Sequence, residues 1–364
     1  MFKNGRLPDI EKVNFKYWNF GNPVQESIAN HIIVKNQKQL VDKGIKIVDL
    51  KNIKTECFAL INKFKGKIIS KDENQFVADN ENAFNCGLFI YVPQNLLLTD
   101  PIEIEIKQED QLDCRIVMCM DSGSSVSMIQ TFNGETVGKK GAKIIEEVNV
   151  KCDAQFKLNT IQHLSNSATY FKQRIKVEQN ANVMWNVEAF NLTNSLNECE
   201  IILDGTGAQG DLKIISLANN KQVQGFNAKI INRKLKTIAK ILQRGIVMDQ
   251  ARIVFNGIGK IENGAHGANS QQENRLLMLS EKAKGDANPI LLIDDNDVQA
   301  GHAASIGKVD LKKMYYLMSR GLSKKVAEKL LVKAFLMPTI DQIPEKDIQM
   351  LLKKQLERRL ENEL

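Results

Sequence analysis

Short stretches of alternating apolar and polar residues fill the middle of the chain. In Ile102–Ile106 three isoleucines alternate with two glutamates, so one face is apolar and the other charged. Alternation with a period of two is typical of a half-buried β-strand. The apolar run Leu88–Val92, closed by Pro93, predicts another strand. The same alternation recurs at Ser125–Thr131, Lys143–Val150, Phe156–Ile161, Tyr170–Val177, Val183–Ala189, Cys199–Leu203, Leu212–Leu217, Val223–Ile230 and Ile238–Leu242.

This regular succession of short strands predicts an all-β core. No proline occurs between Pro101 and Pro289, as expected for strands with neighbours on both sides, where a missing N–H would be costly. A sandwich or barrel and a β-solenoid both fit the pattern. The repeat has no fixed hexapeptide, and the long, even run of strands with Asn and Gly at the turns favours the solenoid.

The segment before the core predicts a mixed α/β region, residues 1–85. Partial helical spacing occurs at Val24–Leu40 and Ile53–Phe64, and short strands are expected at His31–Val34 and Ile45–Val48. The core then spans residues 86–307.

Residues 308–364 predict a helical domain. Asp310 is an expected N-cap for a helix over Leu311–Arg320, which Gly321 ends. Ser323 is expected to cap a second helix that Pro338 ends. The apolar face expected for this second helix consists of Val326, Ala327, Leu330, Leu331, Ala334 and Phe335.

A third helix is expected from Glu345 to Glu361, with Pro344 at its first turn. Its expected apolar stripe consists of Ile348, Leu351, Leu352, Leu356 and Leu360.

Composition narrows the function classes. The 364 residues carry a net charge of +7 with scattered basic residues, which does not indicate a nucleic-acid interface. No apolar run approaches the roughly 20 residues that span a bilayer, and no secretory signal is visible. The six cysteines have no short paired spacing, so we expect free thiols in a reducing cytoplasm.

Three motifs resemble binding sites, but their context argues against that function. Gly205–Gly210 satisfies GxGxxG but leads into a strand pattern, so we interpret it as a turn rather than a dinucleotide site. Gly134–Lys140 is one residue too short for a phosphate-binding loop. Cys114 and Cys119 are five apart in a strand pattern, so they should point to opposite faces and not share a metal.

His302 is the candidate metal ligand. It lies among small residues in Ala300–Ala304, just after the acidic run Asp294–Asp297, and imidazole suits iron. From residue type alone, the simpler interpretation is favoured: a surface or strand-end histidine that is hydrogen-bonded to a nearby carboxylate. Glu273 and Asp297 are candidate helpers, and His266 is interpreted as a turn residue.

Several segments of the last third together resemble the SufB/SufD family of iron–sulfur cluster assembly scaffold proteins. They are Ala251–Asn256, Asn274–Ser280, Asp286–Asp297, Gly301–Gly307 and Tyr315–Leu322. The resemblance implies a right-handed parallel β-helix core. It also implies a non-catalytic scaffold in the SufBCD complex, which pairs with a SufB subunit and docks the ATPase SufC.

The resemblance further implies roles for particular residues. His302 would lie at the SufB interface, where a transient cluster shared with SufB forms, so no cofactor is expected to be bound stably by this chain alone. The expected candidates for contact with SufC are Met314, Tyr315, Leu317, Leu322, Leu331 and Phe335. A homodimer is an open possibility for the chain in isolation.

One departure favours a SufD-type over a SufB-type chain. SufB supplies a cysteine in the C-terminal region, but here no cysteine follows Cys199 and Ser270–Glu273 occupies that stretch. One histidine and carboxylates alone make a poor cluster site, since clusters are normally held by several thiolates. The alternatives are a SufB-type paralogue and a β-helix enzyme acting on polysaccharides through Asp294, Asp295 and Asp297.

Overall fold

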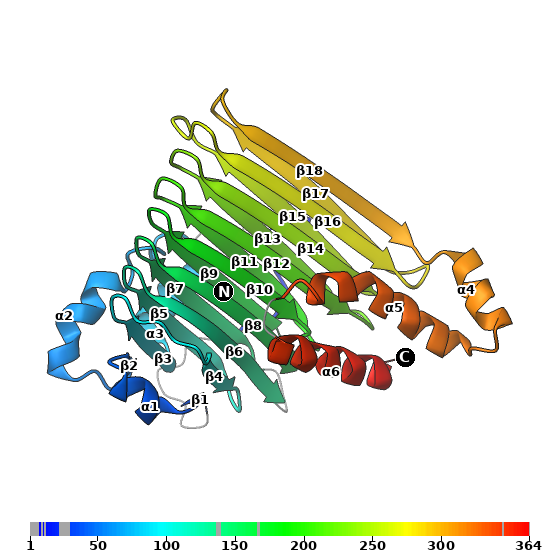
Figure 1. Ribbon diagram of the computed structural model, residues 1–364. Helices are drawn as coiled ribbons and strands as arrows, with labels where there is room; N and C mark the ends of the chain where they lie inside the picture. The colour runs from blue at the N-terminus through cyan, green and yellow to red at the C-terminus, as the bar shows by residue number, and fades with distance from the viewer. Residues whose placement is uncertain are drawn as a thin grey trace.

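The computed structural model is a parallel β-helix of two sheets with helices at both ends (Figure 1). It describes residues 7–8, 10, 12–21, 30–135, 140–165, 168–343 and 346–363. Consecutive strands of the core alternate between the two sheets, and each pairs in parallel with the next strand but one. This topology confirms the predicted solenoid and excludes a sandwich or barrel.

The first sheet, here sheet A, has nine strands. Their order is β1 (His31–Val34), β4 (Ile102–Lys107), β6 (Ser125–Glu135), β8 (Gln155–Ser165), β10 (Asn182–Ala189), β12 (Gln209–Ala218), β14 (Ile238–Val247), β16 (Asn269–Met278) and β18 (Gln299–Lys308).

The second sheet, here sheet B, also has nine strands. Their order is β17 (Lys284–Ile293), β15 (Arg252–Ile261), β13 (Val223–Asn232), β11 (Asn194–Leu203), β9 (Ala168–Val177), β7 (Ala142–Val150), β5 (Leu112–Met120), β3 (Cys86–Val92) and β2 (Lys46–Asp49). Every strand predicted from alternation is present. Pro289 lies in the edge strand β17, where a missing N–H is tolerated.

The inward-facing residues of both sheets form one apolar core. Trp185 on sheet A and Phe226 and Phe255 on sheet B are fully buried in it. The rings of Phe226 and Phe255 lie 5.3 Å apart, in successive turns of sheet B. Stacking of like residues in register therefore replaces the interdigitation of a two-layer sandwich.

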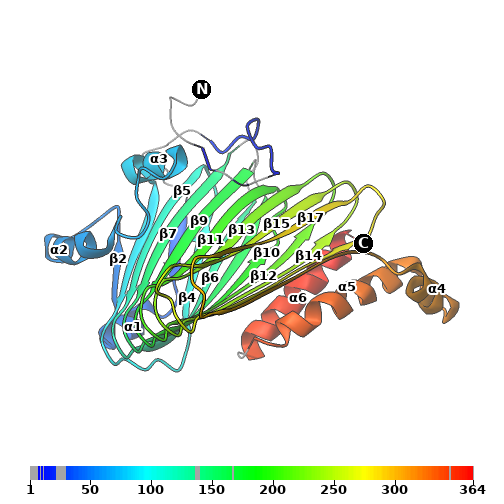
Figure 2. The same ribbon diagram turned by 90° about the horizontal axis from the view of Figure 1, so that it is seen from above.

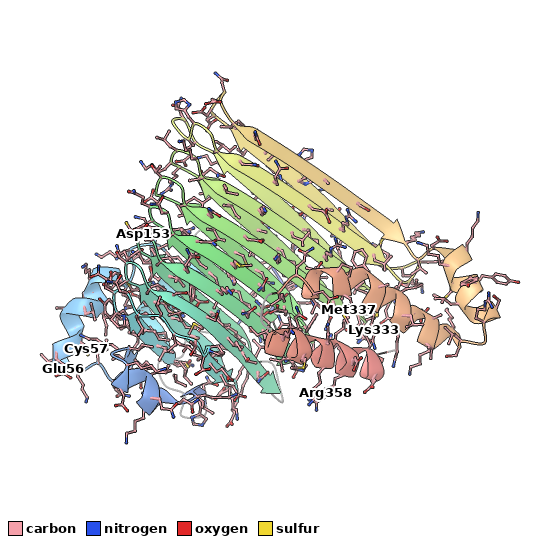
Figure 3. All side chains as sticks on the ribbon, in the orientation of Figure 1. Glu56, Cys57, Asp153, Lys333, Met337 and Arg358 are labelled. Carbon is pink, nitrogen blue, oxygen red and sulfur yellow. The ribbon has the colours of Figure 1, made fainter. Side chains whose placement is uncertain are left out.

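Left-handed residues stack in a column at one edge of the solenoid. Asp153, Asn180 and Gly207 have φ values of 60°, 55° and 71°. Their N–H groups donate to carbonyls of the next turn, at 2.9 Å for Asp153, 3.0 Å for Asn180 and 2.9 Å for Gly207. Asp153 marks this edge in Figure 3. Asn, Asp and Gly recur at the turns because they tolerate this conformation.

The N-terminal region covers the first turns of the solenoid. It contains β1 and β2, which pair antiparallel with β4 and β3. Its helices are α1 (Gln37–Asp42), α2 (Thr55–Phe64) and α3 (Gln75–Ala83). Both predicted strands and the helix near Ile53–Phe64 are confirmed. Part of Val24–Leu40 lies outside the described residues, and the rest forms β1 and α1. The sequence pattern missed α3, whereas β5 contains the strand pattern recognised around Cys114 and Cys119.

Three helices follow the last strand: α4 (Leu311–Ser319), α5 (Lys324–Ile340) and α6 (Lys346–Glu363). Both predicted caps are confirmed. The Asp310 carboxylate accepts from the N–H groups of Lys312 and Lys313, and the Ser323 hydroxyl accepts from that of Val326. Helix α4 projects from the body, whereas α5 and α6 lie along sheet A, as Figure 2 shows from above.

The predicted end of α5 is wrong. Pro338 lies inside α5, which continues to Ile340. A proline inside a helix is unfavourable by about 3 kcal/mol. Burial of Ile340 in the apolar cluster on the outer face of sheet A favours this continuation of the helix.

The predicted apolar faces are partly wrong. Ala327 is buried as predicted, but Val326, Leu330 and Ala334 are exposed. The buried face of α5 also contains Val332 and Leu336, which were not predicted. In α6 the stripe is buried except for Leu351, which is exposed. Pro344 and Glu345 lie outside the described residues.

Candidate functional site

The C-terminal end of the solenoid is an open end with two edge strands. In the described part of the chain, β17 and β18 each pair with a neighbour on one side only. Leu292, Ile293 and Ile306 are large apolar residues exposed on these strands. An edge strand presents unpaired backbone N–H and C=O groups and is therefore a template for pairing with another chain.

His302 lies in the middle of the open edge strand β18 and is exposed. It is in register with Gln272 on β16, which is in register with Ile241 on β14. Register partners in a parallel sheet point to the same face, so His302 continues the inward-facing column at the end where the core is open.

A surface cavity of about 540 Å³ on the outer face of sheet A is lined by Glu273 and by residues 301–303 of β18. Glu273 is in register with Ala303, whereas His302 is in register with Gln272, so the Glu273 and His302 side chains leave the sheet on opposite faces. Its basic residues are Lys213, Lys240 and Arg244. The Glu273 carboxylate lies 3.1 Å from Arg244 Nη2 and 2.8 Å from Arg275 Nε. Burial lowers the pKa of the Arg244 guanidinium, and the charge of Glu273 partly offsets this effect. Glu273 is therefore engaged in ion pairs on the outer face of sheet A.

Asp297 lies away from this cavity. It precedes β18 by two residues, and its N–H donates to Asp295 Oδ1 at 3.1 Å. His302 follows it by five residues along an extended chain, a separation of about 16 Å. Glu273 therefore lies on the strand next to His302 but on the opposite face of the sheet, and Asp297 lies in the turn before β18, so neither candidate helper is brought to the His302 side chain.

Asp295 and His266 form a turn at the start of the strands. His266 Nδ1 lies 3.0 Å from Asp295 Oδ1, and the Gly264 N–H donates to Asp295 Oδ2 at 2.9 Å. These contacts agree with the interpretation of His266 as a turn residue. They also engage the carboxylate of Asp295, one of the three acidic residues of the enzyme alternative, in this turn.

The cysteines lie in the first two thirds of the chain. All six are free; Cys57 and Cys152 are partly buried and the others are buried. Cys114 belongs to the inner core and Cys119 to a cluster on the outer face of sheet B, as the spacing predicted. Burial raises the pKa of the Cys119 thiol to about 12. Among the described residues, no group of three or more His, Cys, Asp or Glu could hold a metal ion.

The pseudo-motifs can also be placed. Gly205–Gly210 leads from β11 to β12 and opens a strand, as predicted. Residues 136–139, the middle of Gly134–Lys140, lie outside the described residues.

The docking candidates on the helices differ in exposure. Tyr315 is 76% exposed, Met314 is buried, and Leu317, Leu322, Leu331 and Phe335 are half-buried. The Phe335 ring lies 5.6 Å from the Arg244 guanidinium, so it packs against sheet A. Sequence reasoning missed a set of exposed apolar residues on α4 and α5, and only the burial of the opposite face identifies them: Leu311, Tyr316, Met318, Val326 and Leu330. Among the described helices, none has both the length and the apolar character to span a bilayer.

Comparison with known proteins agrees with this architecture. Residues 105–335 match the family model of the SufBD core domain of the SUF system for FeS cluster assembly, and residues 25–104 match that of the SufBD protein N-terminal region. The chain therefore belongs to the SufBD family. The iron–sulfur cluster assembly protein SufD of Bacillus subtilis is 35% identical, over 97% of this chain and 90% of its own length. A SufBD family protein of Staphylococcus saprophyticus is 27% identical, over 88% of this chain and 70% of its own length.

Proposed function

We propose that this chain is the SufD-type half of a cytoplasmic iron–sulfur assembly scaffold, paired with SufB through the open end of its β-helix. Family membership assigns the chain to iron–sulfur cluster assembly. The observation that carries the pairing is the open end itself, where two edge strands and the exposed His302 lie together. His302 would contribute one ligand to a cluster, the cargo of the complex, and the sulfur ligands would come from SufB.

In this proposal the C-terminal helices dock the ATPase SufC. The exposed apolar side chains of α4 and the start of α5 support this, because large exposed apolar patches mark interaction sites. Nucleotide binding by SufC would move the helices, and the movement would reach the SufB interface through the solenoid. The energy for this movement would come from nucleotide binding by SufC. A ligand shifts a conformational equilibrium only through its differential affinity for the two states.

The test uses this chain co-expressed with SufB and SufC and purified without oxygen. Iron and acid-labile sulfide are measured per complex for the wild type and His302→Ala. The matched control is His266→Ala, which removes an exposed histidine in a turn. Loss of most iron and sulfide from the assembled His302→Ala complex alone supports the proposal. Equal cluster content in all three complexes refutes the role of His302, and failure to co-purify with SufB refutes the pairing.

A further inference from the structure

Helices α5 and α6 form a hairpin held together by its own polar contacts. Lys333 Nζ on α5, labelled in Figure 3, lies 2.7 Å from Glu357 Oε1 on α6. Lys353 Nζ on α6 lies 2.7 Å from Asp341 Oδ1 at the end of α5. The Gln349 side chain donates to the Ile343 carbonyl at 2.6 Å. These contacts would stay intact if the two helices moved together.

The hairpin packs on the outer face of sheet A through an apolar cluster separate from the inner core. Ile161, Ile215 and Ile246 come from the sheet. The helices contribute Val332, Leu336, Ile340, Ile348, Leu352, Leu356 and Leu360. Because this cluster is separate, the solenoid keeps its own core when the hairpin is absent.

A carboxyl group lies inside this apolar interface. Glu188 on β10 is 1% exposed and in register with Ile161 on β8 and Ile215 on β12. Neither of its side-chain oxygens has a hydrogen-bond partner. Burial raises the pKa of Glu188 to about 8 and outweighs the opposite effect of its own backbone N–H.

No charged group on the surrounding elements bonds to Glu188. The buried titratable residue of α6, Arg359, donates to the Asn191 carbonyl and to Asn219 Oδ1, both at 3.3 Å. On β12, Lys213 lies 3.4 Å from Asp211. On the outer face of β8, the titratable residues are Lys157 and His163. The described buried face of α5 carries no titratable residue: Ala327, Val332, Leu336, Thr339 and Ile340.

The interface holds further polar atoms without partners. Thr339 Oγ1 on α5 and Gln355 Oε1 on α6 are buried and make no hydrogen bond. Such groups lose hydration on docking and regain it on separation. The docked hairpin is therefore less stable than its apolar area alone would make it.

We propose that the α5–α6 hairpin lifts from sheet A as one unit and that Glu188 releases its proton to solvent when it does. Gly321, in the link between α4 and α5, has a φ of +89° and open space around it, and serves as the hinge. The inference concerns this chain alone and does not depend on the proposed partners.

The direction of the pH dependence follows from the raised pKa. Below about pH 4.5 Glu188 is protonated in both states, and above about pH 8 it is ionised in both. Between these values only the open state loses the proton, so rising pH favours opening. One proton corresponds to a change of about tenfold in the opening equilibrium per pH unit.

Hydrogen exchange of the full chain, followed by mass spectrometry at about pH 5.5, 6.5 and 7.5, tests the proposal within the range where only the open state loses the proton. After correction for intrinsic exchange rates, protection of α6 should fall about tenfold per pH unit in the wild type, while that of β9 and β11 should not follow it. In Glu188→Gln, the protection should be higher and independent of pH. The matched control is Glu146→Gln, which neutralises another buried carboxyl but lies inside the solenoid, bonded to Gln130 and Gln173; it should keep the wild-type slope in α6.

The proposal would be overturned if the protection of α6 in the wild type did not change with pH. It would also be overturned if Glu188→Gln kept the wild-type dependence of that protection on pH. If Glu188→Gln does not fold, the infrared spectrum of Glu146→Gln at pH 7 tests whether Glu188 is protonated in the docked state. This variant is used because it lacks the buried carboxyl of Glu146. A carbonyl band of a protonated carboxylic acid supports the proposal, and its absence refutes it.

Discussion

Arg115 on β5 and Glu147 on β7 form an ion pair in which neither side chain is exposed to solvent. The Glu147 carboxylate also accepts from the N–H groups of Gly66 at 2.6 Å, Ile68 at 3.0 Å and Ile69 at 3.2 Å. The pair therefore anchors the segment after α2 to the outer face of sheet B.

Removal of Glu147 should strongly destabilise the fold. Glu147→Ala leaves the Arg115 guanidinium buried without its main partner, and we expect a loss of about 3–5 kcal/mol in the free energy of unfolding. Urea denaturation measures it. The control is Glu103→Ala, which breaks an exposed pair with Lys35 and should change stability by less than about 1 kcal/mol. Equal losses in both variants would contradict the assigned role.

Glu73 should make the N-terminal region sensitive to acid. Burial raises its pKa, but hydrogen bonds and charges from Arg174 and Lys172 outweigh burial and lower the pKa to about 2. A lowered pKa contributes stability above the ordinary value of 4.5 that is lost as pH falls toward 2. Glu73→Gln should lower stability at pH 7 by about 1–3 kcal/mol and remove this dependence. Denaturation midpoints between pH 2 and 6 that fall in parallel for both proteins would refute it.

Gly205 should be intolerant of substitution although its φ is ordinary. A Cβ at this position would lie 2.0 Å from the backbone nitrogen of Gln179 in the turn below. Gly205→Ala should therefore separate stacked turns and destabilise the chain by about 1–3 kcal/mol. Gly307→Ala is the matched control, since nothing lies within 4 Å of its added Cβ. Thermal unfolding compares them, and a Gly205→Ala protein as stable as the control would show that the turns adjust freely.

Substitutions at two adjacent residues of α4 should distinguish a loss of SufC binding from a loss of folding. Tyr315 is exposed and Met314 is buried. Tyr315→Asp should leave thermal unfolding unchanged and weaken association with SufC at least tenfold, whereas Met314→Asp should unfold α4. Calorimetric titration with purified SufC measures the affinity. A folded Tyr315→Asp protein that binds SufC normally would exclude this face of α4 from the docking surface.

Local rules explain what could be predicted along the chain. Successive side chains of a strand point to opposite faces, and Asp310 and Ser323 cap helices through contacts with residues two or three positions on. Both signals act over a few residues, so the strands and helix starts were predictable. Helix α3 was missed although Asn74 caps it, because its apolar residues are few.

The candidate site needed more than local rules. Glu273 is distant from His302 in sequence, yet it lies on the adjacent strand of sheet A, one turn of the solenoid earlier. Asp297 is near in sequence but lies in the turn before β18, about 16 Å from His302, because an extended chain moves about 3.3 Å per residue. Glu188 reads as one more polar residue in an alternating strand, and only the hairpin above it makes it buried.

The sequence by itself determined the strand period, the turn residues, the helix caps and the family, because each depends on neighbours in the chain or on the set of residues as a whole. The tertiary structure decided which helix faces are buried, that α5 continues past Pro338, and which charged groups lose water. These outcomes depend on contacts between segments many residues apart, and the free energy of burying a side chain is set by what covers it rather than by its position in the pattern.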